Sequence, residues 1–306
     1  MEITEIHSID QILTEPTGYY WDFPEVLFTW GNALKSGRLI QIRFGSNWGY
    51  ARAQKNTCKV AAWYGEQFCP QWFGELGFSS IEFQPLSFMT KNVMSGGYNV
   101  PTWFSKESWE QLAVNDRQRR WQFRSALKRY DFIPVSKTDP EHIVDALKIL
   151  KIWIEIAGQR QRLMGTGHYA ACIKMHPQLE NSHMFFLCDK EGKKIGLVGG
   201  YVRDGMAVST NIKHDFSQHS LIHALWGFWL QYVHNELGAK ISCNGSTSDK
   251  IKKEMHMERR LFYKPPKLRY MAPGQLQSSP LGRATSPFTA PTNNGPYPGM
   301  AQLQKP

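Results

Sequence analysis

The chain has 306 residues, of which 42% are hydrophobic and 13% aromatic, and its formal net charge is +10 at pH 7. These values predict a folded chain that buries a core. They exclude a membrane-spanning helix, because no stretch approaches the roughly 20 apolar residues that one needs. Scattered cysteines without CxxC spacing and an acidic N-terminus lead us to expect a cytoplasmic protein without disulfides or metal. The positive charge favours a polyanionic partner, DNA or tRNA, although a merely basic enzyme stays open.

Residues 1–100 form an aromatic-rich, basic N-terminal region. Within it, residues 38–44 (RLIQIRF) alternate between apolar and polar side chains and predict a strand. Arg52, Lys55 and Lys59 follow a loop and are interleaved with aromatic residues. Such a pattern can stack bases while binding phosphates, and it can equally be an ordinary aromatic core. A degenerate half of the fold expected for the rest of the chain is a further interpretation.

Residues 95–101 (SGGYNVP) mark a domain boundary, and residues 105–130 predict one long helix with Ser105 as its N-cap. Trp121 and Phe123 are placed off the basic face of this helix. The basic face carries cations at intervals of three or four residues, which place them on one side of a helix. The cations are Arg117, Arg120, Arg124 and Lys128. They indicate either a solvated surface or contacts to a nucleic-acid backbone.

Residues 131–135 predict a short strand, and Asp139-Pro140 opens a helix whose apolar positions run from 143 to 157. The glycine-flanked, basic segment 158–167 is expected to be a loop that can close over a ligand. A helix at 168–175 follows it.

Residues 184–243 are the most informative stretch. Two apolar runs and the turn Arg203-Asp204-Gly205 predict a three-strand antiparallel meander. A polar loop leads into an apolar helix at 220–237, which Gly238 ends in a left-handed conformation. Residues 239–243 then predict a strand parallel to the third strand of the meander.

Beyond this unit, residues 244–247 predict a turn, Ser248 or Asp249 caps a basic helix, and residues 259–263 return as a strand. Residues 273–306 are rich in Pro, Gly, Ser, Gln and Asn and predict a disordered tail.

The order of these elements resembles the GNAT acyltransferase fold. More narrowly, residues 117–264 are similar to FemAB-type aminoacyltransferases and to the C-terminal domain of phosphatidylglycerol lysyltransferases. The resemblance rests on RQRRWQFRSALKRYDFIPVS, GKKIGLVGGYVRDGMAVSTNIKHDFSQHSLIHALW and LGAKISCNGSTSDKIKKEMH. It implies an α+β fold with a GNAT-like mixed sheet flanked by helices, here assigned to residues 101–272.

In that fold the acyl carbonyl lies between two splayed strands, here those ending near Ile212 and Cys243. The resemblance therefore implies catalytic roles for residues at these ends. They are Asn211, His214, Asp215 and Asn244. It also places the donor against the loop before the long helix, whose residues are Ser217, Gln218, His219 and Ser220. This loop lacks the glycines that wrap acetyl-CoA in GNAT enzymes, so the donor is acyl-CoA (acetyl-CoA) or an aminoacyl-tRNA.

We therefore expect a soluble GNAT-like acyltransferase acting on an amine or hydroxyl, with a modified DNA base as one acceptor. A phage or other mobile element is a fitting source. The alternative is a non-catalytic nucleic-acid-binding protein built on the same scaffold. His219 and His223 stand four residues apart, but no third ligand is evident, and no metal is expected.

Overall fold

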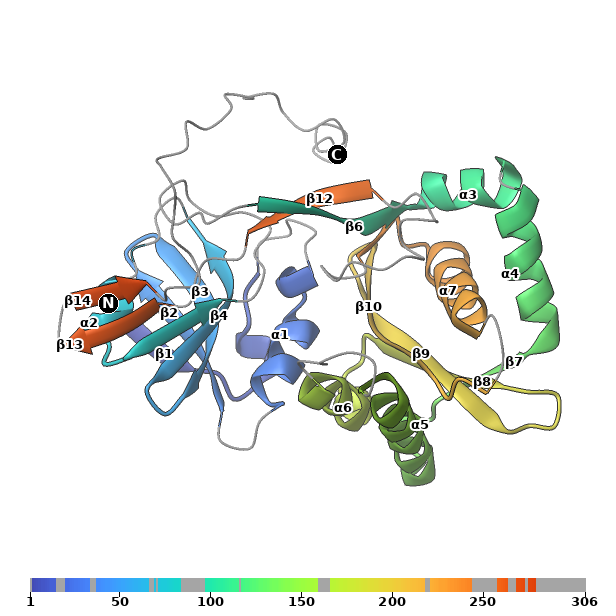
Figure 1. Ribbon diagram of the computed structural model, residues 1–306, viewed down its shortest axis with the longest axis horizontal. Coiled ribbons are helices and arrows are strands. Elements are labelled where there is room, and N and C mark those ends of the chain that lie inside the picture. The colour runs from blue at the N-terminus through green and yellow to red at the C-terminus, as the bar shows by residue number, and fades with distance from the viewer. Residues whose placement is uncertain are drawn as a thin grey trace.

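The computed structural model describes residues 2–14, 20–33, 37–65, 69, 71–83, 97–115, 117–158, 166–217, 221–243, 258–263, 268–272 and 275–278. Their strands form two seven-stranded sheets, and the chain is an α+β protein, as predicted. The two sheets lie side by side with α1 between them (Figure 1). None of the described helices combines the length and apolar character needed to cross a bilayer.

The first sheet is built mainly from the N-terminal region. Its strand order is β1 (Glu2–Glu5), β2 (Arg38–Phe44), β3 (Asn47–Gln54), β4 (Thr57–Tyr64), β5 (Ser80–Phe83), β13 (Leu268–Ala272) and β14 (Gln275–Ser278). The helical elements of this region are η1 (Ile9–Gln11), η2 (Tyr20–Asp22), α1 (Pro24–Gly31) and α2 (Gln71–Glu75). The predicted strand at 38–44 is confirmed as β2. β14 lies inside the segment predicted to be a disordered tail, and the rest of that segment falls outside the described residues.

Most of the aromatic side chains that the structure describes in this region are buried on the two faces of the first sheet. Tyr50 and Tyr64 belong to the cluster on the α1 side, and Trp63 and Phe73 belong to the cluster on the α2 side. These side chains are between 0% and 5% exposed. A buried ring cannot stack on a nucleic-acid base, so for these residues the core interpretation is the correct one.

The second sheet has the order β12 (Glu258–Tyr263), β6 (Gly97–Ser105), β11 (Ile241–Cys243), β10 (Met206–His214), β9 (Lys194–Arg203), β8 (Ser182–Cys188) and β7 (Asp131–Pro134). Its helices are α3 (Lys106–Asn115), α4 (Arg117–Arg129), α5 (Pro140–Gly158), α6 (Thr166–Met175), η3 (His176–Gln178), α7 (Leu221–Gln231) and the π-helical turn η4 (Tyr232–Glu236). One face is covered by α7, with α4 packed on it, and the other face is covered by α5 and α6.

The predicted central unit is confirmed strand by strand. β8, β9 and β10 form an antiparallel meander, α7 follows, and β11 pairs with β10 in parallel. Asp204 and Gly205 both have positive φ, at 50° and 73°, as a two-residue hairpin turn of type I′ requires. Gly238 has φ 67° and ends the helix, as predicted.

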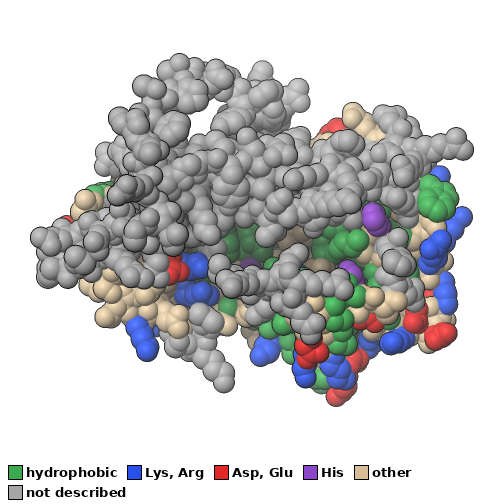
Figure 2. All heavy atoms as spheres, viewed as in Figure 1, with side chains coloured by type: hydrophobic (Ala, Val, Ile, Leu, Met, Phe, Trp, Pro, Cys, Tyr) green, Lys and Arg blue, Asp and Glu red, His purple; other side chains and the backbone are tan. Residues whose placement is uncertain are grey.

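The range expected as one helix, residues 105–130, is described as two helices. Ser105 does cap the first, because the Ser105 hydroxyl accepts a hydrogen bond from the Ser108 N–H at 3.0 Å. α3 is described to Asn115 and α4 from Arg117, with Asp116 outside the described residues, and α4 packs against α7. The two helices run in different directions (Figure 1), so a single straight helix is wrong. In Figure 2, Lys and Arg side chains lie along the right edge of the molecule, over α4.

Where the two sheets meet, a partly buried ion pair joins α1 to β9. Glu25 of α1 is 1% exposed, and its Oε1 accepts from Arg203 Nη2 at 2.7 Å and from Asn181 Nδ2 at 3.0 Å. A single apolar cluster also contains residues of α1, α6, β9 and β10. β6 crosses the proposed boundary at residue 100, and β13 joins the first sheet from within residues 101–272. The division into domains stays a prediction.

Candidate functional site

The site begins where the described pairing of β10 with β11 ends. This pairing covers Met206–Val208 and Ile241–Cys243, whereas β10 continues to His214 and residues 244–257 lie outside the described residues. Over residues 209–214, β9 is therefore the only described strand that pairs with β10. The register with β9 also shifts between Ser209 and Asn211, which is a β-bulge. A bulge leaves a residue outside the ladder and bends the strand, and it often lies beside a functional site.

Asn211 stands at this bulge and is completely buried. Neither its Nδ2 nor its Oδ1 has a hydrogen-bond partner among the described residues. Leaving a buried polar group unpaired costs about 1–3 kcal/mol, and such groups need an explanation in a native structure. An amide that can accept and donate, placed at a bulge in a strand, has the chemistry to hold a polar ligand.

Lys213 is two residues further along β10, so its side chain leaves the same face as that of Asn211. It is 7% exposed. The Lys213 ammonium lies 4.0 Å from the ring centroid of Trp153 on α5 and 3.8 Å from that of Tyr169 on α6. Cation–π contacts of this kind hold the charge in place. Sequence reasoning missed Lys213, although its spacing of two from Asn211 was a signal.

His214 ends β10 and is kept neutral. Burial lowers its pKa to about 4, against the opposing effect of Asp215 and with a smaller contribution from Lys213. The Phe216 N–H donates to His214 Nδ1 at 3.2 Å. Because Nδ1 accepts, the proton of the neutral ring is on Nε2. His214 therefore presents a hydrogen-bond donor at Nε2.

Asp215 organises the loop that follows. Its Oδ1 accepts from the Ser217 N–H at 2.9 Å and from the Ser217 hydroxyl at 2.6 Å, and its own N–H donates to Ile195 O. Phe216 between them has φ 61°, an uncommon conformation for a residue with a Cβ. The predicted site residues Gln218, His219, Ser220 and Asn244 lie outside the described residues.

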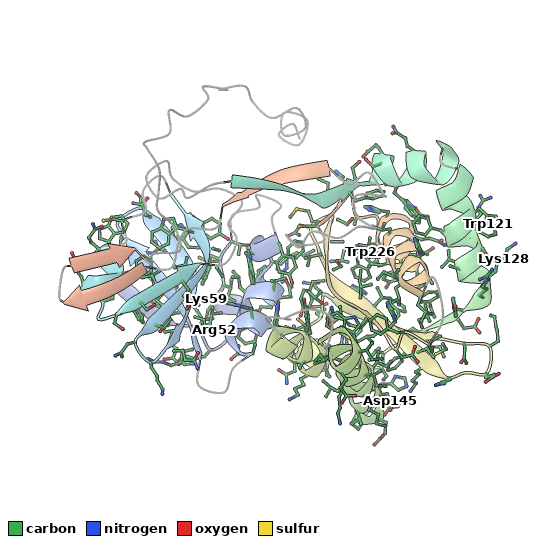
Figure 3. The ribbon with its side chains drawn as sticks, viewed as in Figure 1. Arg52, Lys59, Trp121, Lys128, Asp145 and Trp226 are labelled. Carbon is green, nitrogen blue, oxygen red and sulfur yellow. The ribbon has the colours of Figure 1, made fainter. Side chains whose placement is uncertain are left out.

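The basic residues predicted on α4 lie away from this site. Arg124 and Lys128 are exposed, whereas the structure describes only the backbone of Arg117 and Arg120. Figure 3 shows Trp121 and Lys128 both pointing outward from α4. Trp121 was placed off the basic face, and this is wrong. It stands four residues after Arg117 and seven before Lys128, which is the spacing of one helix face.

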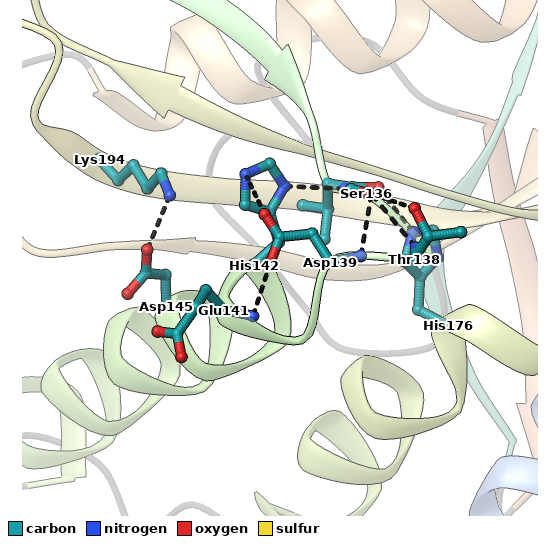
Figure 4. Close-up of polar contacts among 9 residues, drawn as sticks. Ser136, Thr138, Asp139, Glu141, His142, Asp145, His176 and Lys194 are labelled. Atoms are coloured by element: carbon teal, nitrogen blue, oxygen red, sulfur yellow. Dashed lines mark hydrogen bonds and ion pairs between the residues drawn. The ribbon is translucent and has the colours of Figure 1, made fainter.

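Two further polar clusters serve the fold. At the start of α5 (Figure 4), Asp139 Oδ1 accepts from the Glu141 N–H at 2.9 Å, which confirms the predicted cap. His142 Nδ1 accepts from the Ser136 N–H at 2.9 Å, and Lys194 pairs with Asp145 at 2.7 Å. These groups satisfy one another and the helix N-terminus.

The second cluster is buried where α1 meets α6. Thr29 Oγ1 lies 3.2 Å from His168 Nε2 and accepts from Cys172 Sγ at 3.5 Å. Burial is the largest single effect and raises the pKa of the Cys172 thiol, but His168, Tyr201 and Thr29 together outweigh it and the pKa is lowered. The thiol is 1% exposed, so it is a packing residue here. Among the described residues, no three His, Cys, Asp or Glu side chains are grouped closely enough to hold a metal ion.

No protein-family model matches the sequence, and no curated protein shows significant similarity to it. Solved structures do match. The C-terminal domain of a protein described as a lysylphosphatidylglycerol synthetase, from Agrobacterium fabrum, has a TM-score of 0.54 at 11% identity and covers 79% of this chain and 85% of its own. FemX has a TM-score of 0.53 at 10% identity, covering 89% and 98%. L-PGS from Bacillus licheniformis has a TM-score of 0.51 at 10% identity, covering 81% and 93%. The fold is GNAT-like, as predicted.

Proposed function

We propose that this chain transfers an acyl or aminoacyl group to an amine or hydroxyl, at the segment of β10 beyond its described pairing with β11. The observation that carries the proposal is the buried amide of Asn211 at the bulge, which has no hydrogen-bond partner among the described residues. The likeness in fold to FemX and L-PGS supports it.

The reaction mainly requires that the donor and the acceptor be held in the right geometry. The acceptor nitrogen or oxygen attacks the acyl carbonyl carbon, and a tetrahedral intermediate with a negative oxygen forms. The bond to the donor then breaks, which is a C–S bond for acyl-CoA and a C–O bond for aminoacyl-tRNA. The proton lost by the acceptor finishes on the departing sulfur or oxygen. Backbone N–H groups of residues 209–214 that face away from β9 are suited to hold the developing oxyanion.

His214 is better suited to donate a hydrogen bond than to collect a proton. Its Nδ1 is occupied by the Phe216 N–H, and its low pKa makes the neutral ring a weak base. The Nε2–H can stabilise the oxyanion or the departing group. Asp215 is proposed to fix the conformation of the loop, because its carboxylate accepts hydrogen bonds from the N–H and the hydroxyl of Ser217.

The donor is proposed to lie against residues 215–220 and the start of α7, where helix N–H groups favour a phosphate. Lys213 adds a positive charge on the face of β10 that packs against α5 and α6. The net charge of +10 supports a nucleic acid as the acceptor, with an amine or hydroxyl on a modified DNA base as the specific proposal.

The test is mass spectrometry of candidate acceptors after incubation with acetyl-CoA or with charged tRNA. We expect one donor to give a mass increase on an amine- or hydroxyl-bearing acceptor. His214→Ala should lower kcat by about 10²- to 10³-fold, because it removes the Nε2–H donor proposed to stabilise the oxyanion or the departing group. Lys190→Gln, on an exposed turn, is the matched control and should leave kcat unchanged. Nucleic-acid binding without transfer from either donor would favour the non-catalytic alternative.

A further inference from the structure

The outer face of α4 exposes a large aromatic side chain in an unusual setting. Trp121 is 65% exposed, whereas Phe123 on the same helix is 4% exposed and packs with Trp109 and Trp226. The packing of α4 on α7 is close, because a Cβ added at Gly227 would lie 2.6 Å from Phe123 Cδ1. Phe123 thereby sets the rotation of α4 about its axis, and Trp121 is held away from the rest of the fold.

Cations surround this indole on the same face. α4 reads RQRRWQFRSALKR, with six basic residues and no acidic one. Arg124 and Lys128 are exposed and stand three and seven residues after Trp121, so they share its face at intervals of about one turn. Among the side chains that the structure describes, none forms an ion pair with either of them.

A polyanion with flat, stackable groups matches such a face. Single-stranded nucleic acid provides phosphates for the cations and unpaired bases for the indole, and aromatic rings beside basic residues are how proteins bind it without sequence preference. A duplex keeps its bases stacked internally and offers the indole nothing comparable. A membrane surface fits less well, because an interfacial helix needs a broad apolar face. Of the other apolar positions on α4, Phe123 and Ala126 are buried and Leu127 is half-buried, so no broad apolar face is exposed.

We propose that the outer face of α4 binds a single-stranded segment of nucleic acid, with one base stacked on Trp121 and the adjoining phosphates on Arg124 and Lys128. DNA and RNA share this chemistry. This surface would hold the acceptor of the proposed transfer, so its biological purpose rests on the proposed function. Binding is measured without any donor, however, so failure of binding and failure of transfer are separate results.

The experiment measures fluorescence anisotropy of labelled single-stranded oligonucleotides, one of DNA and one of RNA, titrated with the full chain. Trp121→Ala should weaken binding by about 5- to 150-fold, which is the range for losing one base–aromatic stack. Trp121→Phe should restore most of it. Arg124→Gln with Lys128→Gln should flatten the log–log salt dependence by about 0.7 for each phosphate that the variant no longer neutralises. If only the DNA or only the RNA oligonucleotide shows both the loss of affinity and the flatter salt dependence, that result identifies the sugar of the bound nucleic acid.

The control removes two positive charges elsewhere. Lys148→Gln with Lys190→Gln changes two exposed lysines on α5 and on the β8–β9 turn, and it should leave the salt dependence unchanged. Equal loss of affinity in this control, or unaltered binding by Trp121→Ala, overturns the proposal. So does a duplex, an anionic phospholipid vesicle or polyglutamate that binds as tightly and with the same dependence on Trp121.

Discussion

Replacing Asn211 with Leu is expected to stabilise the protein while removing activity. Leucine has the same number and branching of side-chain heavy atoms as asparagine, but it carries no polar group. In the free protein both amide atoms of Asn211 are buried without a partner among the described residues, so the wild-type residue costs stability. If the amide exists to hold a ligand, its loss improves folding and impairs function, as is usual for residues kept for activity.

The magnitude follows from that unpaired amide. Leaving a buried polar group unpaired lowers stability by about 1–3 kcal/mol, and leucine removes that cost. Strain from the bulkier methyl groups of leucine offsets about 1 kcal/mol of this gain. A net gain of up to about 2 kcal/mol is expected. For 306 residues, an unfolding entropy of about 2.1 cal/mol/K per residue sums to about 0.64 kcal/mol/K. The melting temperature should therefore rise by up to about 3 °C. Loss of a hydrogen bond to the reacting group should lower kcat by about 10²- to 10³-fold.

The assay is a thermal melt followed by circular dichroism, paired with turnover of whichever donor proves active. Asn211→Ala is the comparison variant, because it also removes the amide but leaves a cavity that lowers the melting temperature. If Asn211→Leu melts as low as Asn211→Ala, the amide is paired in the free protein and the expected gain in stability is refuted. If Asn211→Leu keeps full kcat, Asn211 is outside the site.

Three further changes probe the framework. Gly227→Ala should lower the free energy of unfolding by about 1–3 kcal/mol, because its methyl group meets Phe123, and urea denaturation should show partial rescue by Phe123→Leu. Glu25→Gln should cost about 1–3 kcal/mol in the same assay by removing a charged acceptor from Arg203, and Arg203→Lys should cost less. Burial lowers the pKa of His214 to about 4, so the unfolded chain takes up this proton first as the pH falls. Stability should be unaffected by this group above pH 6.5 and should decline by up to about 3 kcal/mol between pH 6.5 and 4. His214→Gln should remove that part of the decline, and an identical pH profile in wild type and variant would contradict the assignment.

Local features of the fold followed from the sequence because their causes are local. The alternation of residues 38–44 gave the bounds of β2, and the left-handed preference of Asp204-Gly205 gave the hairpin between β9 and β10. The position of Gly238 gave the end of the helical segment that starts with α7. From these, the order of strands in the central unit followed, since a short turn pairs neighbouring strands and a single helix returns the chain in parallel.

Tertiary structure alone decided which polar groups lack partners and which rings face solvent. Asn211 was predicted from the resemblance, but its isolation depends on the bulge in the pairing with β9 and on its burial by distant parts of the chain, neither of which is encoded next to it. Lys213 is held by rings from α5 and α6, so its surroundings come from distant parts of the chain. Trp121 and Phe123 are two residues apart on one helix. Only contact with α7 buries the second and leaves the first in water, because the rotation of a helix is set by what it packs against.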